Sequence, residues 1–335
     1  MADLRKERLD RGVKVRSDTI YALSSMKEIL FLLGPGIALI VLLLVMPVAL
    51  DFYWQRVMAI TGVYVLLAIG FGFLANYLGL VCLGGALFVG VGGYISGILN
   101  SSLGLPIGIT IPIATVLGAL ICTVAMLPAL PLKGVYFAII SFVYPLAVSR
   151  LIVAADLFGG TDGIAGLAIF PNIWVILYLI IPLMLIVVFL MSRLVNYEDL
   201  GLVFRGVKDN DQAIKASGLN ITWYRAQGVF IAALMGCFGG AFLTHLYGWV
   251  GISLLAMDFS ILPVAASVVG GPGTIYGPMI GALILVPVSE GLRPFGALRV
   301  VFYATILVLF IVFFTEGILD FVRRKYEQFE RWVRV

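Results

Sequence analysis

Only a few side chains that could contact a solute lie within or beside the long apolar segments of this sequence. Arg150 lies about four residues before the end of one such segment, and His245 lies near the end of another. Glu290 lies three residues before Arg293, so the two can pair on one face of a helix. A charge inside a lipid bilayer costs about 2.5 to 3.5 kcal/mol or more. Residues of this kind are therefore candidates for a role in function.

Each of these residues also has a purely structural explanation. Arg150 could extend to the lipid interface, which we regard as equal in weight to facing a polar cavity. Pairing of Glu290 with Arg293 is favoured over contact with a solute. A single histidine binds metal weakly, so His245 is expected to make structural hydrogen bonds, and Asp258 to be an exposed helix cap. No acid or histidine lies in the middle of an apolar segment, which argues against proton coupling.

The sequence lacks the motifs that catalysis would need. There is no GxxxxGK[ST] loop to hold the phosphates of ATP, no pair of metal ligands, and no spacing that supports a Ser-His-Asp triad. Cys82, Cys122 and Cys237 fall inside apolar segments, where a cysteine behaves as a small hydrophobic residue. We therefore expect neither enzymatic activity nor a bound cofactor.

The elements that would position these residues are membrane-spanning helices. Of the 335 residues, 62% are hydrophobic and 12% are charged, and the mean hydropathy is +1.11, outside the range of soluble proteins. We predict an all-α polytopic membrane protein of about ten spans, some of them short or broken. The expected spans are 29–50, 57–74, 78–99, 105–130, 134–154, 173–192, 226–250, 254–269, 275–292 and 300–319. Of these, 254–269 and 275–292 are close to the lower length limit of about 17 residues.

The basic residues predict how the chain is oriented in the membrane. If both termini are cytoplasmic, 18 of the 22 lysines and arginines lie on the inner side, among them Lys133 in a short turn. Only Arg56, Arg293 and Arg299 then lie on the outer side. The expected parts are a cytoplasmic tail over 1–28, a permeation domain over 29–319 and a second cytoplasmic tail over 320–335. The first apolar run is too long for a cleavable signal peptide, so none is expected.

The longest polar interval between apolar segments covers residues 193–225 and carries nine charges. Such a stretch cannot lie in hydrocarbon, so it is predicted to be a cytoplasmic loop. Residues 209–216 have good helix formers, acids at their start and a basic residue near their end, and Gly218 follows as a stop. We predict a short amphipathic helix here that docks another protein.

Two glycine-rich stretches, 79–94 and 268–282, have two explanations of equal weight. Glycines allow helices to pack closely, which needs no further function. They also permit broken helices, whose exposed backbone groups can contact a translocated solute.

Five stretches are similar, in the same order, to motifs of one family. Residues 79–94 are similar to GLxSLGHxxFxGxGAY, 133–139 to RGxYxAI, 159–164 to TGGxxGI, 201–219 to GRxxxAIRExExAAxxxGI, and 268–282 to VLGGxGxxxGPxxGA. On these matches the chain from residue 57 onward resembles the inner-membrane permease of branched-chain amino-acid ABC importers, the M-type subunit. It also resembles the related permeases that import urea and short amides.

The resemblance implies a subunit of a bacterial or archaeal inner membrane. Its partners would be a second homologous permease, two ATP-binding cassette ATPases that hold the ATP, and an extracytoplasmic solute-binding protein. The loop 193–225 would be the element that couples the permease to the ATPase. The residues assigned to coupling are Gly201, Arg205, Lys208, Asp209, Asp211, Ala213 and Gly218. The residues assigned to the translocation pathway are Gly84, Gly85, Tyr94, Arg150, Thr161, Asp162, Gly270, Gly271 and Glu290.

The chain departs from the family pattern at three positions. Gly85 stands where the family usually has His, Ala147 where it has Glu, and Leu202 where it has Arg. Loss of the first two polar groups would leave a more apolar pathway, which suits branched-chain or other apolar amino acids. Import of urea or short amides is the alternative within the same class. From a different class, the chain could be a self-sufficient secondary carrier or channel that works without ATP.

Overall fold

The computed structural model describes residues 26–132, 134–271 and 273–296, together with 298, 305, 308 and 317–319. Most of the predicted tail 1–28, Lys133, Arg299, most of the predicted last span and the tail from residue 320 lie outside the described residues. The chain divides into two units, Met1–Val48 and Ala49–Val335. In the first unit, helix α2 (Met26–Ala49) has 24 residues, of which Ala38–Ala49 form a shorter apolar helix.

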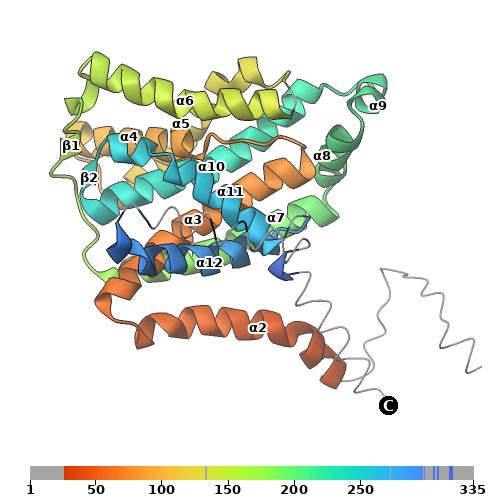
Figure 1. Ribbon diagram of the computed structural model, residues 1–335, viewed down its shortest axis with the longest axis horizontal. Helices are drawn as coiled ribbons and strands as arrows, with labels where there is room; N and C mark the ends of the chain where they lie inside the picture. The colour runs from red at the N-terminus through yellow and green to blue at the C-terminus, as the bar shows by residue number, and fades with distance from the viewer. Residues whose placement is uncertain are drawn as a thin grey trace, which may run out of the picture. The chain divides into compact units, whose positions relative to one another are not determined.

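The second unit is a bundle of helices built around α3 (Phe52–Tyr77) and α10 (Ile221–Tyr247), which are buried along most of their length (Figure 1). The two helices are antiparallel. Gly239 of α10 lies against Val63 of α3, and Gly228 lies against Leu78 just beyond the end of α3. Because these glycines have no side chain, the neighbouring side chains can approach the helix backbone.

The other helices pack around this pair. On one side, α4 (Gly85–Leu103) and α5 (Ile107–Met126) pack against α10. On the other side, α11 (Asp258–Gly270), α12 (Tyr276–Gly291) and α7 (Ile173–Tyr197) pack against α3. Helix α6 (Val135–Ala154) lies along an edge of the bundle and is mostly exposed (Figure 1). Within the described residues, seven helices are long and apolar enough to cross a membrane, which confirms an all-α polytopic membrane protein.

The predicted span 78–99 is wrong at its start, because α4 begins only at Gly85. Residues 78–84 are not helical, yet Leu78, Leu80 and Cys82 are buried. An apolar composition indicates burial but does not distinguish a buried helix from a buried extended segment. Residues 78–103 therefore form a first broken element inside the bundle, in which a non-helical stretch is followed by helix α4.

A second broken element connects α10 to α11. It contains strand β2 (Trp249–Val250) and the 3₁₀ turn η3 (Ile252–Leu255), and it runs along α4 over a row of glycines. In order, Val250, Leu254, Leu255 and Phe259 lie against Gly97, Gly93, Gly90 and Gly85. The close packing expected of the first glycine-rich stretch is thus confirmed, and what packs on its glycines is an interrupted helix. Contact of its backbone with a solute stays a prediction.

The connection between α6 and α7 is held to this second broken element. Strand β1 (Ile164–Ala165) pairs with β2 in antiparallel fashion, with Ile164 opposite Val250. The indole N–H of Trp249 donates a hydrogen bond of 2.8 Å to the carbonyl oxygen of Asp162. The loop therefore covers one end of the bundle as a defined structure.

His245 is buried and has the structural role predicted for it. Its Nε2 lies 2.9 Å from Ser96 Oγ, and its Nδ1 lies 2.8 Å from the carbonyl oxygen of Ala168. The side chain therefore joins α10 to α4 and to the connection between α6 and α7. The three cysteines are buried, as predicted for small hydrophobic residues, and their thiols are free.

Candidate functional site

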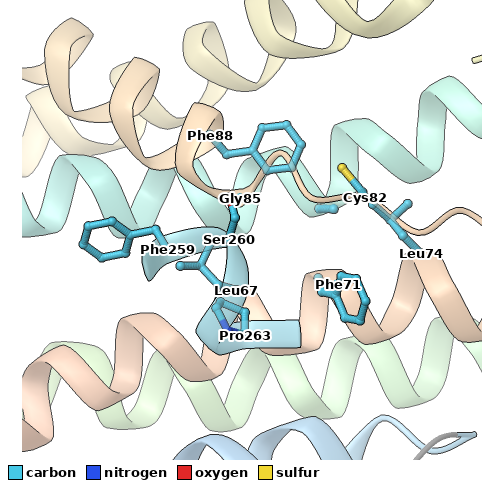
Figure 2. Close-up of a pocket in the computed structure, with 11 residues that line it drawn as sticks. Leu67, Phe71, Leu74, Cys82, Gly85, Phe88, Phe259, Ser260 and Pro263 are labelled. Carbon is cyan, nitrogen blue, oxygen red and sulfur yellow. The ribbon is translucent and has the colours of Figure 1, made fainter. Parts of the chain in front are cut away.

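A small cavity lies where both broken elements meet α3 (Figure 2). Its volume is about 20 Å³, which is room for about one water molecule. The residues that line it are Leu67, Gly70, Phe71, Leu74, Cys82, Gly85, Phe88, Ala232, Phe259, Ser260 and Pro263. Almost all of these side chains are apolar, and the hydroxyl of Ser260 is the main polar group. The bundle is therefore closed to organic solutes at this point.

The first turns of α4 and α11 touch each other at the cavity. A Cβ atom on Gly85 would collide with the carbonyl oxygen of Phe259. The next amide, that of Ala86, donates a hydrogen bond of 3.0 Å to Ser260 Oγ. The first amides of a helix have no partner within the helix, so Ser260 satisfies one of them from the neighbouring helix. The histidine that the resembling family usually has at position 85 would not fit here unless α11 moved.

Tyr94 lies farther along α4, under the connection between α6 and α7. Its ring is 6.0 Å from that of Phe158 in the 3₁₀ turn η2 (Leu157–Gly159). The hydroxyl of Tyr94 is buried and has no hydrogen-bond partner among the residues that the structure describes. Leaving such a group unpaired costs about 1–3 kcal/mol. A polar group or water that approached Tyr94 would therefore be favoured.

The remaining glycines assigned to the pathway lie at close contacts or in a tight turn. Gly84 precedes α4 and lies against Met126. Gly270 ends α11 and lies against the carbonyl oxygen of Gly277, and Gly271 follows with a φ of 118°. The turn after α11 therefore brings the backbones of α11 and α12 into direct contact.

The polar residues assigned to the pathway do not lie at the cavity. Arg150 is exposed on α6, and Thr161 and Asp162 are exposed in the connection to α7. Glu290 accepts hydrogen bonds from Arg293 Nη1 at 2.7 Å and from Tyr53 Oη at 2.8 Å, so the predicted pairing with Arg293 is confirmed. Hydrogen bonding to Glu290 raises the pKa of the Arg293 guanidinium.

The polar stretch 193–225 contains more helix than the sequence indicated. After the end of α7 come α8 (Asp199–Asp209) and α9 (Asp211–Ala216), and α10 begins at Ile221. The predicted helix over 209–216 is therefore real, but Asp209 belongs to α8. The side-chain oxygen of Asn210 accepts hydrogen bonds from the backbone amides of Gln212 and Ala213, at 3.0 and 3.2 Å. Asn210 is thus the N-cap that separates the two helices.

The stop predicted at Gly218 is confirmed. Gly218 has a φ of 80°, in the left-handed region that favours glycine. Its amide donates to the carbonyl of Lys215, and the amide of Leu219 donates to that of Ile214. This pair of bonds is the Schellman motif, which ends a helix and satisfies its last carbonyls.

Three residues assigned to coupling hold α8 against the bundle. A Cβ on Gly201 would collide with the carbonyl oxygen of Val195, so α8 folds back closely on the end of α7. Arg205 donates a hydrogen bond of 2.8 Å to Asn196 Oδ1 and lies over the ring of Tyr77. Lys208 Nζ donates one of 2.9 Å to the carbonyl oxygen of Asn76 at the end of α3.

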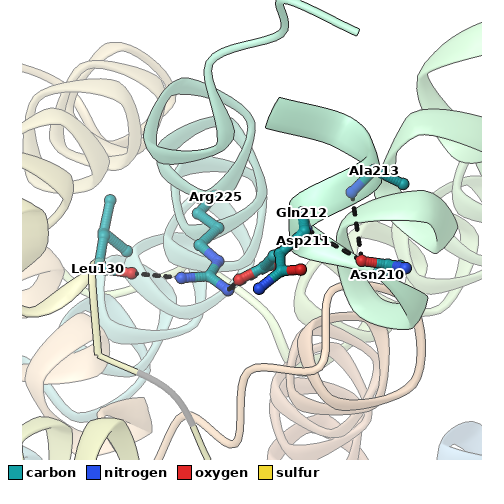
Figure 3. A network of polar contacts seen from close by, with 6 residues as sticks. All are labelled: Leu130, Asn210, Asp211, Gln212, Ala213 and Arg225. Carbon is teal, nitrogen blue, oxygen red and sulfur yellow. Dashed lines mark hydrogen bonds and ion pairs between the residues drawn. The ribbon is translucent and has the colours of Figure 1, made fainter. Parts of the chain in front are cut away.

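The next three residues assigned to coupling, Asp209, Asp211 and Ala213, do not all face the same way. Asp209 and Ala213 are exposed, whereas the carboxylate of Asp211 points into the protein and pairs with Arg225 of α10 (Figure 3). Arg225 Nη2 lies 3.2 and 3.0 Å from the two carboxylate oxygens, and Nη1 donates a hydrogen bond of 2.9 Å to the carbonyl oxygen of Leu130. Sequence reasoning did not assign a role to Arg225, Leu130 or Asn210.

A larger space opens beside this ion pair. Its volume is about 280 Å³, and it lies between the junction of α8 with α9 and the start of the first broken element. The residues that line it are Leu78, Gly79, Val207, Lys208, Asp209, Asn210, Asp211, Gln212 and Arg225. Among the described residues there is no group of three or more His, Cys, Asp or Glu side chains that could hold a metal ion.

Spanning helices, two broken elements that meet at a closed cavity, and a pair of short helices at one end are features typical of a membrane permease. The chain belongs to the family described as branched-chain amino acid transport system / permease component, whose family model matches residues 53–314.

The chain is similar to curated proteins that carry this description. One is the high-affinity branched-chain amino acid transport system permease protein LivM of Escherichia coli, 24% identical over 331 residues, which cover 90% of this chain and 77% of the relative. The LivM protein of Salmonella typhimurium is 24% identical with the same coverage. A probable branched-chain amino acid transport permease protein LivM of Methanocaldococcus jannaschii is 25% identical over 197 residues, 54% of each chain. No solved structure matches.

Proposed function

We propose that the chain carries branched-chain or other apolar amino acids across the cytoplasmic membrane as the permease of an ATP-driven importer. The family match over residues 53–314 is the observation that carries this proposal. The apolar lining of the cavity also supports it, because Phe71, Phe88 and Phe259 would favour an aliphatic side chain over a small polar solute.

We infer that α9 is the coupling helix and lies in the cytoplasm, where it meets an ATPase subunit. In support of this, α9 lies at the end of the bundle from which the polar stretch 193–225 projects, and it contributes no buried residue to the protein core. Asp209 and Ala213 are exposed, so a partner can contact them. With α9 in the cytoplasm and the ten spans predicted from the sequence, both termini would also lie in the cytoplasm.

The complete importer then requires further chains. These are a second homologous permease, two ATPases that bind the ATP, and an extracytoplasmic solute-binding protein. This chain itself holds no cofactor. The connection between α6 and α7 would face the solute-binding protein, because it covers the end of the bundle opposite α9.

The cavity corresponds to a closed stage of a transport cycle. A solute could pass only if the start of α4 separated from that of α11, which would break the hydrogen bond between Ala86 and Ser260. ATP binding and hydrolysis in the partner would drive this separation through α9. The pathway would therefore be open to one side of the membrane at a time.

The test is uptake by the complex that co-purifies with this chain, reconstituted into lipid vesicles with its solute-binding protein. We expect ATP-dependent accumulation of radiolabelled leucine, isoleucine or valine, and none without ATP. Accumulation of radiolabelled urea or acetamide instead would overturn the proposed substrate. Uptake by vesicles that contain this chain alone, independent of ATP, would overturn the importer itself in favour of a carrier or channel.

A further inference from the structure

We propose that Asp211 and Arg225 form the joint through which a movement of α9 enters the membrane bundle. This inference rests on the proposed coupling function of α9. It goes further in naming one ion pair, and Arg225 in particular, as the positioning residues that connect the ATPase side to the helices of the pathway.

The first argument is that α9 has little apolar packing through which to transmit a force. None of its residues is fully buried, and Ile214 packs against Gly206 of α8. Its neighbour α8 is different, because Phe204 and Val207 are buried and Gly201 lies against the end of α7. A rigid displacement needs a direct contact, and Asp211 supplies one from the first turn of α9.

The second argument is the place of Arg225. Only 5% of this residue is exposed, and its guanidinium connects three parts of the chain. It is attached to the first turns of α10, it binds Asp211 of α9, and it donates to the carbonyl of Leu130 in the connection between α5 and α6 (Figure 3). The central helix α10 would thus move with α9, together with the segment that leads into α6.

The third argument is the space around the pair. A volume of about 280 Å³ lies beside the pair, between the α8–α9 junction and Leu78. Lys208, near the end of α8, does lie against Gly79 and donates to the carbonyl oxygen of Asn76. Because side chains do not fill this space, displacement of α9 would not be transmitted there by packing. The ion pair is therefore a direct contact of α9 itself with α10, whereas α8 contacts the end of α3 through Lys208.

The fourth argument is the cost of the pair. The side chains of Arg225 and Asp211 are 6% and 9% exposed, so both charges have lost most of their water. Apolar side chains of similar size would stabilise such a site as well as an ion pair does. Arg225 Nε also has no partner within the described parts of the chain. The pair is better explained by directional contact between moving parts than by stability.

The experiment uses the complete reconstituted complex and measures molecules of radiolabelled leucine taken up per ATP hydrolysed. We expect this ratio to fall roughly tenfold in Asp211→Asn and in Arg225→Met. The double variant should be no worse than either single variant, because both changes break the same contact. A role in folding alone would lower the amount of assembled complex but leave the ratio per complex unchanged.

The matched control is Arg193→Met. Arg193 pairs with Glu198 in the same polar stretch at 3.4 Å, but its side chain is 63% exposed. An exposed pair contributes little, so the ratio should stay at the wild-type value. If the complex with Arg225→Met does not assemble, the ratio measured for Asp211→Asn tests the proposal by itself, because that substitution leaves α10 unchanged.

Two results separate this inference from the proposed function beneath it. Wild-type coupling in both Asp211→Asn and Arg225→Met would overturn the joint while leaving α9 as the coupling helix. If the wild-type complex contained no ATPase, or took up leucine without ATP, the coupling function itself would fail, and the joint with it.

Discussion

Gly85 at the start of α4 lies directly against the carbonyl oxygen of Phe259 at the start of α11, with no side chain between them. The two helices belong to the two broken elements, and their contact closes the bundle at the cavity. Only glycine allows the backbones to approach this closely. The state of the pathway therefore depends on a contact between two helix ends.

Replacing Gly85 with alanine should destabilise this closed contact. The added Cβ must displace the backbone of α11, and overpacking of this kind costs about 1–3 kcal/mol. We expect a lower unfolding temperature of the purified complex. In Gly108→Ala, which adds the same methyl group in α5, nothing lies within 4 Å of the new atom, so stability should not fall and should rise by up to about 1 kcal/mol. Equal stability of the two variants would contradict the structure at Gly85.

The spanning helices were predictable because the signal of an apolar run is strong, and the end of α9 was predictable because a glycine follows it. The start of α4 was not, since residues 78–84 are as apolar as the helix that follows. Helix α8 was missed because its buried residues, Gly201, Phe204 and Val207, are only three in a charged stretch. The partner of Arg225 at Leu130 is 95 residues away in sequence, and no local pattern contains such a contact.

Tyr94→Phe should change stability and transport in opposite directions. The hydroxyl of Tyr94 is buried without a partner in the described part of the chain, so its removal should stabilise the protein by about 1 kcal/mol. If this hydroxyl contacts the amino acid during passage, uptake of leucine should become slower at low concentration. Thermal unfolding and the concentration dependence of uptake measure the two effects. Unchanged uptake would remove Tyr94 from the pathway.

Asn210→Ala should weaken the start of α9. Two backbone amides lose the side-chain oxygen that now accepts from them, and the loss of an N-cap costs about 1 kcal/mol. We expect faster hydrogen exchange over Asp211–Ala216 and a weaker association with the ATPase. Asn210→Ser keeps a capping oxygen and should restore both. If Asn210→Ala and Asn210→Ser behaved alike, the cap would have no role in docking.

Gly218→Val should disturb the other end of the same helix. At a φ of 80°, a residue with a Cβ atom costs roughly 1–2 kcal/mol, and the β-branched side chain of valine is especially unfavourable. The two hydrogen bonds of the Schellman motif would be lost, so α9 would end differently and present another surface to its partner. We expect less ATPase to co-purify, and less leucine to be taken up per ATP hydrolysed.

Gly218→Asn is the matched control. Asparagine tolerates the left-handed conformation, so this variant should retain most of the ATPase association and most of the leucine uptake per ATP. Normal assembly of Gly218→Val would mean that the loop only connects α7 to α10, and that the ATPase binds elsewhere on the chain.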